Sequence, residues 1–224
     1  MFFRDDLCVY RTSGFKKIPW LEHGFGTSNS LPWPDSWRLA TLRQVHSAIA
    51  GIARGPANRD TDGDALITEV PGLLVGVRTA DCLPILLVDE RRRVVAAVHA
   101  GWKGTLAEVA PKTVVRMQEE FGAEPARIHA AVGPGIGECC FEVGPEVAAR
   151  FERLFPERRD LSGRARVDLS EANRRLLVRA GVPDEQIHRG APCSCCLPSE
   201  FYSYRRNPSD QGRMLSVIGI RPSE

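Results

Sequence analysis

The sequence predicts a mixed α/β fold, and two kinds of pattern lead to that prediction. Short runs rich in Val, Ile and Leu are separated by turn residues, which is typical of buried β-strands. Apolar residues at helical spacing follow some of these runs, between recognisable helix start and stop signals. The clearest strands are predicted at residues 65–68, 73–77, 83–88 and 94–98.

The chain is expected to form a single domain spanning residues 1–224. Its length allows one sizeable core, and no repeat, low-complexity tract or linker divides it. Residues 1–37 are expected to be an irregular N-terminal segment, with one short strand at 7–10. Within it, residues 31–37 carry two prolines and two tryptophans and predict packed but irregular structure. One strand or a pair of strands is expected over residues 39–52.

A single helix is predicted after the strand at 94–98. Thr105 and Glu108 have the spacing of a capping box, so the helix is expected to open there. Gly122 supplies the stop signal. Pro111 lies inside this pattern and is expected to kink the helix.

The second half of the chain alternates between strand and helix patterns. Strands are predicted at 128–132, 164–169 and 214–220. One helix is expected to begin at Pro145, since proline suits the first helical position. Another is expected to be capped by Ser170.

Composition excludes several classes of protein. A net charge of +2 gives no argument for binding nucleic acid or a membrane surface. The apolar runs are too short to span a bilayer, and the N-terminus has no signal-peptide pattern. We therefore expect a cytoplasmic protein, in which the seven cysteines are ligands or buried thiols rather than disulfides.

Three residues are candidate metal ligands: His46, Cys82 and His99. Imidazole and thiolate donors suit zinc, or copper, rather than magnesium. Three protein ligands with one open position are typical of a catalytic zinc. His99 follows a predicted strand, at the kind of position where α/β sheets bind ligands. Spacing does not distinguish these residues from ordinary core or surface positions.

Several motifs resemble one family. They occur in this order: Gln44-Val45-His46-Ser47, Asp62-Gly63-Asp64-Ala65, Thr79-Ala80-Asp81-Cys82-Leu83-Pro84, Val98-His99-Ala100-Gly101-Trp102, Gly133-Pro134-Gly135-Ile136-Gly137 and Phe201-Tyr202-Ser203-Tyr204-Arg205-Arg206. Together they resemble the YfiH/LACC1-like purine nucleoside phosphorylase family, formerly called multicopper polyphenol oxidases with a laccase-like domain.

The resemblance implies several further properties. The matching His46, Cys82 and His99 would hold one metal ion, usually zinc, and would be the catalytic residues. The activity would be phosphorolysis of adenosine, inosine and methylthioadenosine, with adenosine deamination as a second activity. The fold would be a layered α/β/β/α arrangement with mixed sheets.

The sequence departs from the family pattern near its N-terminus. Members usually carry an arginine soon after a Gly-x-Ser/Thr turn, whereas this turn reads Gly26-Thr27-Ser28-Asn29-Ser30. Arg78, Arg205 and Arg206 are candidate replacements.

Four residues are candidate substrate contacts. Arg205 or Arg206 could hold phosphate with two parallel hydrogen bonds, or form a solvated surface pair. Phe141 could stack on a purine or pack in the core. Ser47 adjoins a ligand and could bind substrate or merely end a strand.

A carboxylate is also expected to move protons in a deamination reaction. The candidates are Asp62, Asp64, Asp81 and Glu142. Asp81 adjoins Cys82, and neighbours in an extended segment point opposite ways, so we expect Asp81 to be structural or to orient a histidine ligand.

The remaining cysteines allow two interpretations. Cys139, Cys140, Cys193, Cys195 and Cys196 could form a second, structural metal site. Their spacing matches no standard zinc ribbon, so buried thiols are favoured.

Other functions use the same residues. A single copper ion at the three-ligand site could oxidise phenols. Cys82 and His99 could form a cysteine hydrolase, for example in editing peptidoglycan precursors. A fourth ligand would instead indicate a non-catalytic binding module. The expected partners are purine nucleosides and phosphate, without nucleic acid or membrane, and the chain is expected to be a monomer.

Overall fold

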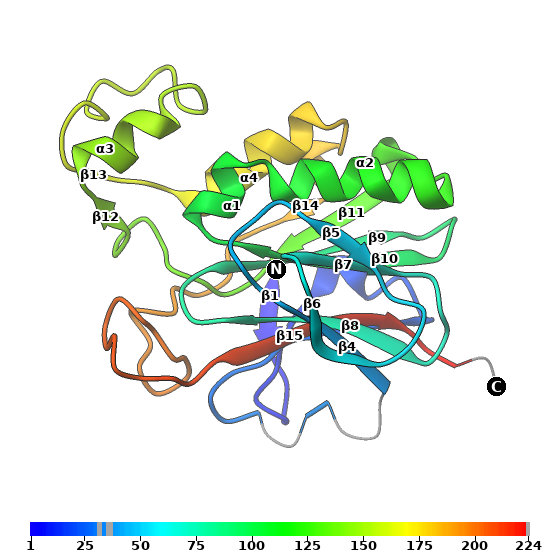
Figure 1. Ribbon diagram of the computed structural model, residues 1–224. Coiled ribbons are helices and arrows are strands. Elements are labelled where there is room, and N and C mark those ends of the chain that lie inside the picture. Colours follow the sequence, from blue (N-terminus) through cyan, green and yellow to red (C-terminus); the bar gives the residue numbers. More distant parts are fainter. Residues whose placement is uncertain (31–32, 35–37, 223–224) are drawn as a thin grey trace.

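The computed structural model describes residues 1–30, 33–34 and 38–222. Two β-sheets lie face to face, and helices cover the outer side of one of them (Figure 1). The prediction of a mixed α/β fold is confirmed.

The larger sheet has seven strands that come from both ends of the chain. In spatial order they are β1 (Phe2–Arg4), β2 (Tyr10–Thr12), β3 (Leu21–Phe25), β15 (Met214–Ile220), β8 (Leu73–Thr79), β4 (Arg38–Arg43) and β6 (Ala57–Asp62). Strand β4 runs parallel to both β8 and β6, whereas the other pairings are antiparallel.

The second sheet has six strands and forms the central layer. In spatial order they are β14 (Ile187–His188), β11 (Ile128–Val132), β9 (Leu83–Asp89), β10 (Val94–Ala100), β7 (Ala65–Thr68) and β5 (Ala50–Ile52). In β9, Ile85 and Leu87 belong to the core under the helices, whereas Leu86 and Val88 belong to the core between the sheets. Because both faces are covered, the strand is apolar from Leu83 to Val88 rather than alternating.

Three helices pack on this central sheet, and a smaller unit adjoins them. The three are α1 (Trp102–Leu106), α2 (Val109–Phe121) and α4 (Leu169–Arg179). The smaller unit contains α3 (Pro145–Ala148) and the paired strands β12 (Glu142–Val143) and β13 (Ala165–Arg166), and Phe151 links it to the core under the helices. In the part of the chain that the structure describes, no helix is long and apolar enough to cross a membrane.

The prediction of an irregular N-terminal segment was wrong, because β1, β2 and β3 lie within it. Strand β3 pairs with β15 from the other end of the chain, and a local pattern cannot reveal such a partner. The strand predicted at 7–10 is instead a turn with Cys8 at φ 58°, and β2 begins only at Tyr10. Of the packed segment predicted at 31–37, only residues 33–34 are described.

The single kinked helix predicted after β10 was also wrong. Two helices occur there, separated at Glu108, which has a left-handed backbone (φ 62°). Thr105 lies inside α1 and caps nothing. Pro111 falls in the first turn of α2. A backbone N–H at that position has no hydrogen-bond acceptor within the helix, so proline breaks no helical bond there and no kink is needed.

The cap predicted at Ser170 is two residues too late. Asp168 caps α4, because its side chain accepts a hydrogen bond from the Glu171 N–H. The strand predicted at 164–169 is only β13, since the cap begins a helix immediately afterwards. The strands predicted at 65–68, 128–132 and 214–220 are confirmed, as is the helix that begins at Pro145.

Candidate active site

Three chain segments bring His46, Cys82 and His99 together. His46 follows β4, Cys82 lies in the turn between β8 and β9, and His99 is near the end of β10. One ligand atom from each side chain lies within 4.8 Å of the other two. The ring centroids of the two histidines are 4.9 Å apart.

Asp64, at the start of β7, positions both histidines. Its Oδ1 accepts the His46 N–H at 3.0 Å and lies 2.8 Å from Nδ1 of the buried His99. Its Oδ2 accepts the hydroxyl of Ser47 at 2.7 Å. A carboxylate at Nδ1 leaves Nε2 of His99 free to act as a ligand.

Both turns that present ligands use left-handed backbone. His46 has φ 57°, and Asp81, the residue before Cys82, has φ 82°. Such conformations are costly for residues other than glycine and occur where surrounding bonds hold them in place. Asp64 holds the first turn, and the Ile136 N–H holds the second by donating to the Asp81 carbonyl at 2.7 Å.

The charges of the site favour a thiolate beside imidazoles. Burial would raise the pKa of Cys82, but hydrogen bonds from His46 and His99 outweigh it and lower that pKa to about 6. Burial would lower the pKa of His99, but Asp64 and Cys82 outweigh it and raise that pKa to about 9. Asp64 is buried, yet hydrogen bonds from His99 and Ser47 lower its pKa to about 2.

The donor set fits a metal ion. One thiolate and two imidazoles are ligands that zinc and copper accept. Gly101 leaves room beside them, because a Cβ at that position would lie 2.7 Å from Cys82 Sγ and 3.2 Å from His46 Nδ1. Among the described residues, no fourth His, Cys, Asp or Glu joins this ligand group.

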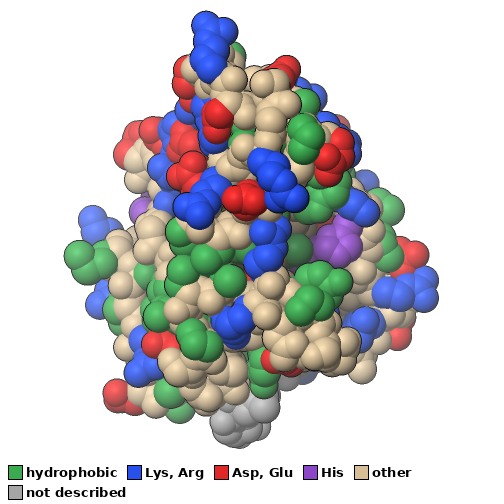
Figure 2. Space-filling view, turned by 90° about the vertical axis from the view of Figure 1, so that its left-hand side faces the viewer, with side chains coloured by type: hydrophobic (Ala, Val, Ile, Leu, Met, Phe, Trp, Pro, Cys, Tyr) green, Lys and Arg blue, Asp and Glu red, His purple; other side chains and the backbone are tan. Residues whose placement is uncertain are grey.

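The three ligands open into a pocket of about 570 Å³. Ligand pockets for small molecules have volumes of roughly 300–1,000 Å³. In the space-filling view, a histidine lies beside hydrophobic and Lys or Arg side chains on a hollowed face (Figure 2). Besides the ligands, the pocket is lined by four arginines and three aromatic residues: Arg59, Arg78, Arg205, Arg213, Trp102, Phe141 and Tyr204.

Comparison with known proteins is consistent with this geometry. Residues 28–221 match the family described as multi-copper polyphenol oxidoreductase laccase. The chain belongs to this laccase family. The resemblance deduced from the motifs is thereby confirmed.

Members of the laccase family that resemble this chain carry names of purine enzymes. A purine nucleoside phosphorylase of Deinococcus radiodurans is 45% identical over 184 residues, which are 81% of this chain and 70% of the relative. The adenosine deaminase RL5 of an unknown prokaryotic organism is 43% identical over 190 residues, which are 82% of this chain and 68% of the relative.

Solved structures of similar proteins share the fold of this laccase-family chain. The crystal structure of YlmD from Geobacillus stearothermophilus has a TM-score of 0.87 and 28% identity, and 98% of each chain is covered. The hypothetical protein YfiH of Bacillus licheniformis has a TM-score of 0.86 and 26% identity, with 98% of this chain and 99% of the other covered.

Two of the four predicted substrate contacts line the pocket, and two do not. Phe141 and Arg205 line it, and the Arg205 guanidinium lies 5.6 Å from the centroid of the Phe141 ring. Ser47 instead bonds Asp64. Arg206 donates to the backbone carbonyls of Ser194, Cys195 and Phe201, so its guanidinium braces loops. Substrate binding by these four residues stays a prediction.

Asp81 is structural, as expected, but it does not orient a histidine ligand. Its carboxylate accepts the Ser194 hydroxyl and the Arg205 N–H, each at 2.7 Å, and thereby joins distant loops. Asp64 orients His99 instead. Adjacency to Cys82 was a poor guide, because the left-handed turn directs the Asp81 side chain toward other segments.

The other two carboxylate candidates lie outside the pocket lining. Asp62 pairs with Arg43 on the surface, and Glu142 pairs with Arg164 at 2.9 Å. Sequence reasoning also missed Arg59 and Arg213 as pocket residues. They lie outside the motifs that carry the family resemblance, so no signal in the sequence connected them with His46 or Cys82.

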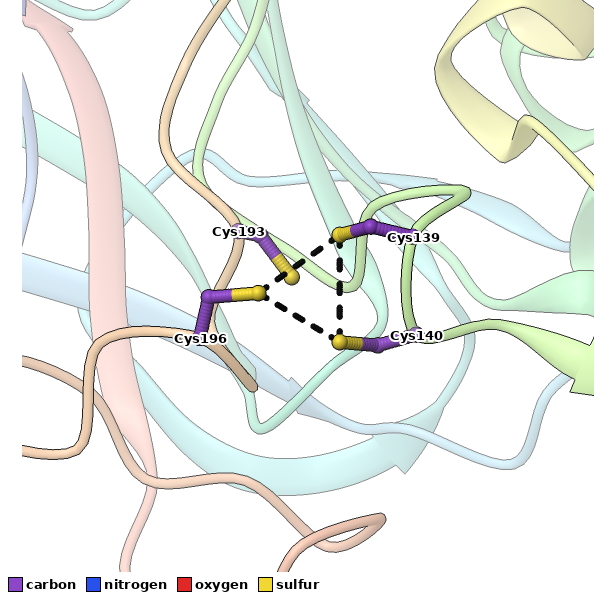
Figure 3. Close-up of side chains that lie close together, drawn as sticks. All are labelled: Cys139, Cys140, Cys193 and Cys196. Atoms are coloured by element: carbon purple, nitrogen blue, oxygen red, sulfur yellow. Dashed lines mark hydrogen bonds between the residues drawn. The ribbon is translucent and has the colours of Figure 1, made fainter.

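The prediction of buried thiols was wrong, because none of these five cysteines is fully buried. Four of them, Cys139, Cys140, Cys193 and Cys196, gather in one place, and Cys139 and Cys196 are exposed (Figure 3). The reason is that two loops meet at the surface, which spacing along the chain does not show. Cys195 is not one of this group of four and packs against the core.

Proposed function

We propose that this chain is a metal-dependent purine nucleoside phosphorylase. Adenosine, inosine and methylthioadenosine are the proposed substrates, adenosine deamination is a second activity, and zinc is the proposed ion. The names of the relatives support an enzyme that acts on purines. The three-ligand arrangement, which leaves a coordination position for substrate, supports metal dependence.

One observation carries the phosphorolysis proposal: four arginines line the pocket without acidic partners. Arg59, Arg78, Arg205 and Arg213 make no ion pair with any acidic side chain in the described part of the chain. Thirteen of the other 22 arginines do make such pairs, whereas none of the four that line the pocket does. Uncompensated guanidinium groups beside a cavity are suited to a phosphate anion.

The aromatic wall of the same pocket suits the base. Phe141 and Tyr204 contribute aromatic rings to its lining, and Ile136 and Leu169 add apolar side chains. A purine can stack on such a surface, while Arg205 holds an anion beside it.

The metal site supports the proposed chemistry in a second way. When bound, the ion would supply Lewis acidity at the end of the pocket. Asp64 keeps His99 in the tautomer that offers Nε2, and the turn at His46 is held by the same carboxylate.

The direct test is phosphate dependence. Purified full-length protein should release adenine from adenosine and hypoxanthine from inosine only when phosphate is present. His46→Ala and Cys82→Ala should each abolish the release, whereas Arg116→Ala, on the exposed face of α2, should leave it unchanged. A protein with one bound ion that turns over no purine nucleoside would contradict the proposal.

A second candidate function is favoured by one observation. Cys82, His99 and Asp64 form a thiol, imidazole and carboxylate series like that of a cysteine hydrolase, and the low pKa of Cys82 is suited to a nucleophile. In that function His46 would stabilise the thiolate by a hydrogen bond and would hold no metal ion. Hydrolytic activity that survives metal removal would favour it over the phosphorylase.

A third candidate function of the same three ligands is phenol oxidation by a single copper ion. Metal analysis of protein purified without added copper separates it from the zinc enzyme. Copper at one equivalent, with phenol turnover and no nucleoside turnover, would decide for the oxidase.

A further inference from the structure

Four cysteine thiols from two loops lie together outside the pocket. Cys139 and Cys140 come from the loop between β11 and β12, and Cys193 and Cys196 come from the loop after β14. The Sγ atoms of Cys139 and Cys140 lie 3.5 Å and 3.4 Å from that of Cys196, and 3.8 Å from each other. All four Sγ atoms lie within 4.8 Å of one another, and they point toward a common centre (Figure 3).

These separations match a single bound ion. In a disulfide the two sulfurs are about 2.05 Å apart, much closer than any of the separations given above. Four sulfurs placed tetrahedrally at about 2.3 Å from one zinc ion are roughly 3.8 Å apart. In a four-iron cluster each cysteine binds a different iron, which requires wider spacing than is found here.

The surroundings of the thiols also suit a metal-bound thiolate. The Gly137 N–H donates to Cys193 Sγ at 3.2 Å, a bond that stabilises negative charge on the sulfur. A Cβ on Gly137 would lie 3.2 Å from Cys139 Sγ and 3.3 Å from Cys193 Cβ, so the absence of a side chain there allows the loops to approach closely. Cys193 and Cys196 also have the Cys-x-x-Cys spacing common in zinc sites.

We propose that Cys139, Cys140, Cys193 and Cys196 bind one zinc ion in a closed structural site. This site is separate from the group of His46, Cys82 and His99, and its chemistry differs, because four thiolates fill a tetrahedral ion completely. No position remains for substrate, so the ion acts as a cross-link between the two loops.

The cross-link would brace one wall of the pocket. Ser194, between two of the cysteines, donates its hydroxyl to Asp81 at 2.7 Å. Arg205 donates to the Cys140 carbonyl at 3.1 Å and to the Glu142 carbonyl at 2.9 Å. Phe141 directly follows Cys140, so an ion that fixes the two loops also fixes the aromatic and arginine side chains that line the pocket.

The test counts metal ions in matched variants of the full-length protein, purified under reducing conditions. If both centres bind zinc, wild type should contain about two ions per chain, and Cys139→Ser/Cys196→Ser should contain about one fewer. Cys195→Ser is the matched control and should keep the wild-type content, since Cys195 lies in the same loop but is not one of the four grouped cysteines.

A second measurement examines the ion itself and does not require the cysteine variant to fold. His46→Ala/Cys82→Ser should retain one zinc ion, and X-ray absorption should show sulfur as its only ligand type. This readout is independent of nucleoside turnover, so failure of the phosphorylase proposal would leave it intact. The structural site is overturned if Cys139→Ser/Cys196→Ser keeps the full zinc content, if the retained ion has nitrogen or oxygen ligands or is iron, or if mass analysis finds disulfides among these cysteines.

Discussion

The Asp64 carboxylate holds Nδ1 of His99 at 2.8 Å while it accepts the backbone N–H of His46. One side chain therefore sets the ring orientation of one candidate ligand and the backbone of another. The pairing of β10 with β7 creates this relationship, because it places Val98 opposite Ala65 and brings the neighbouring His99 and Asp64 together.

Asp64→Asn should weaken metal binding by about 10–100-fold, since loss of a carboxylate partner typically costs a metal site that much. The amide keeps the volume but removes the charge that holds the Nδ1 proton. Competition with a chelator measures the change. Asp62→Asn is the control, because Asp62 pairs with Arg43 at the exposed surface. Equal metal affinity in wild type and Asp64→Asn would contradict the role assigned to Asp64.

Gly101→Ala should lower metal content and activity together. The new Cβ would lie 2.7 Å from Cys82 Sγ, closer than unbonded atoms approach, so the thiol must leave its position. Gly163→Ala serves as control, because a Cβ there would lie 3.9 Å from the Asp160 carbonyl oxygen, an ordinary contact. Metal analysis and circular dichroism on both proteins distinguish loss of the site from loss of the fold. Undiminished metal content in Gly101→Ala would show that the space is not required.

Arg78→Ala should raise the KM for phosphate by about 10-fold or more, as expected for loss of a charge-assisted hydrogen bond. This prediction rests on the proposed phosphorylase. Gln44 fixes the Arg78 backbone with two hydrogen bonds of 2.8 Å, so the guanidinium extends from a defined position. Steady-state rates at varied phosphate measure the effect, with Arg116→Ala as the surface control. An unchanged KM for phosphate would remove Arg78 from the anion site.

His23 should make the folded protein sensitive to mild acid. Burial, with Arg11 and Arg221 nearby, lowers the pKa of His23 from 6.5 to about 3. Between those values the unfolded chain binds a proton that the folded chain does not, so the free energy of unfolding falls as pH falls. The loss is about 1.4 kcal/mol for each pH unit below 6.5.

Urea unfolding at pH 7.5 and pH 5 measures this slope in wild type and in His23→Gln. The glutamine can accept the hydrogen bond that the Thr12 N–H now donates to the ring, but it does not titrate. We expect the variant to lose less stability on acidification than wild type. Equal losses would assign the acid sensitivity to other groups.

Much of the fold could be predicted from local pattern. The strands β7, β11 and β15 have the predicted bounds, since each is a short apolar run between turn residues. The N-terminal strands could not be predicted, because they are short, partly exposed and stabilised by pairing with distant segments. The break at Glu108 was also hidden, since a left-handed residue other than glycine leaves no sequence signal.

The candidate site, like the fold, was only partly predictable from the sequence. The motifs identified His46, Cys82 and His99 as candidate ligands, because each of these residues lies in a short continuous segment that resembles the family. Other features of the site depend on which strands and loops become neighbours in space. These are the hydrogen bond between Asp64 and His99, the loop contacts of Asp81 and Arg206, and the grouping of four cysteines.

The sequence by itself determined the α/β class, the position of the main strands and the three candidate ligands near their ends. Only the tertiary structure decided which side chains meet those ligands, which arginines line the pocket without acidic partners, and which thiols form a second cluster. The physical reason is the separation of the residues along the chain. Hydrophobic periodicity is a property of adjacent residues, whereas a binding site consists of contacts between residues that are far apart in the sequence. The register of the strands decides which of these residues meet.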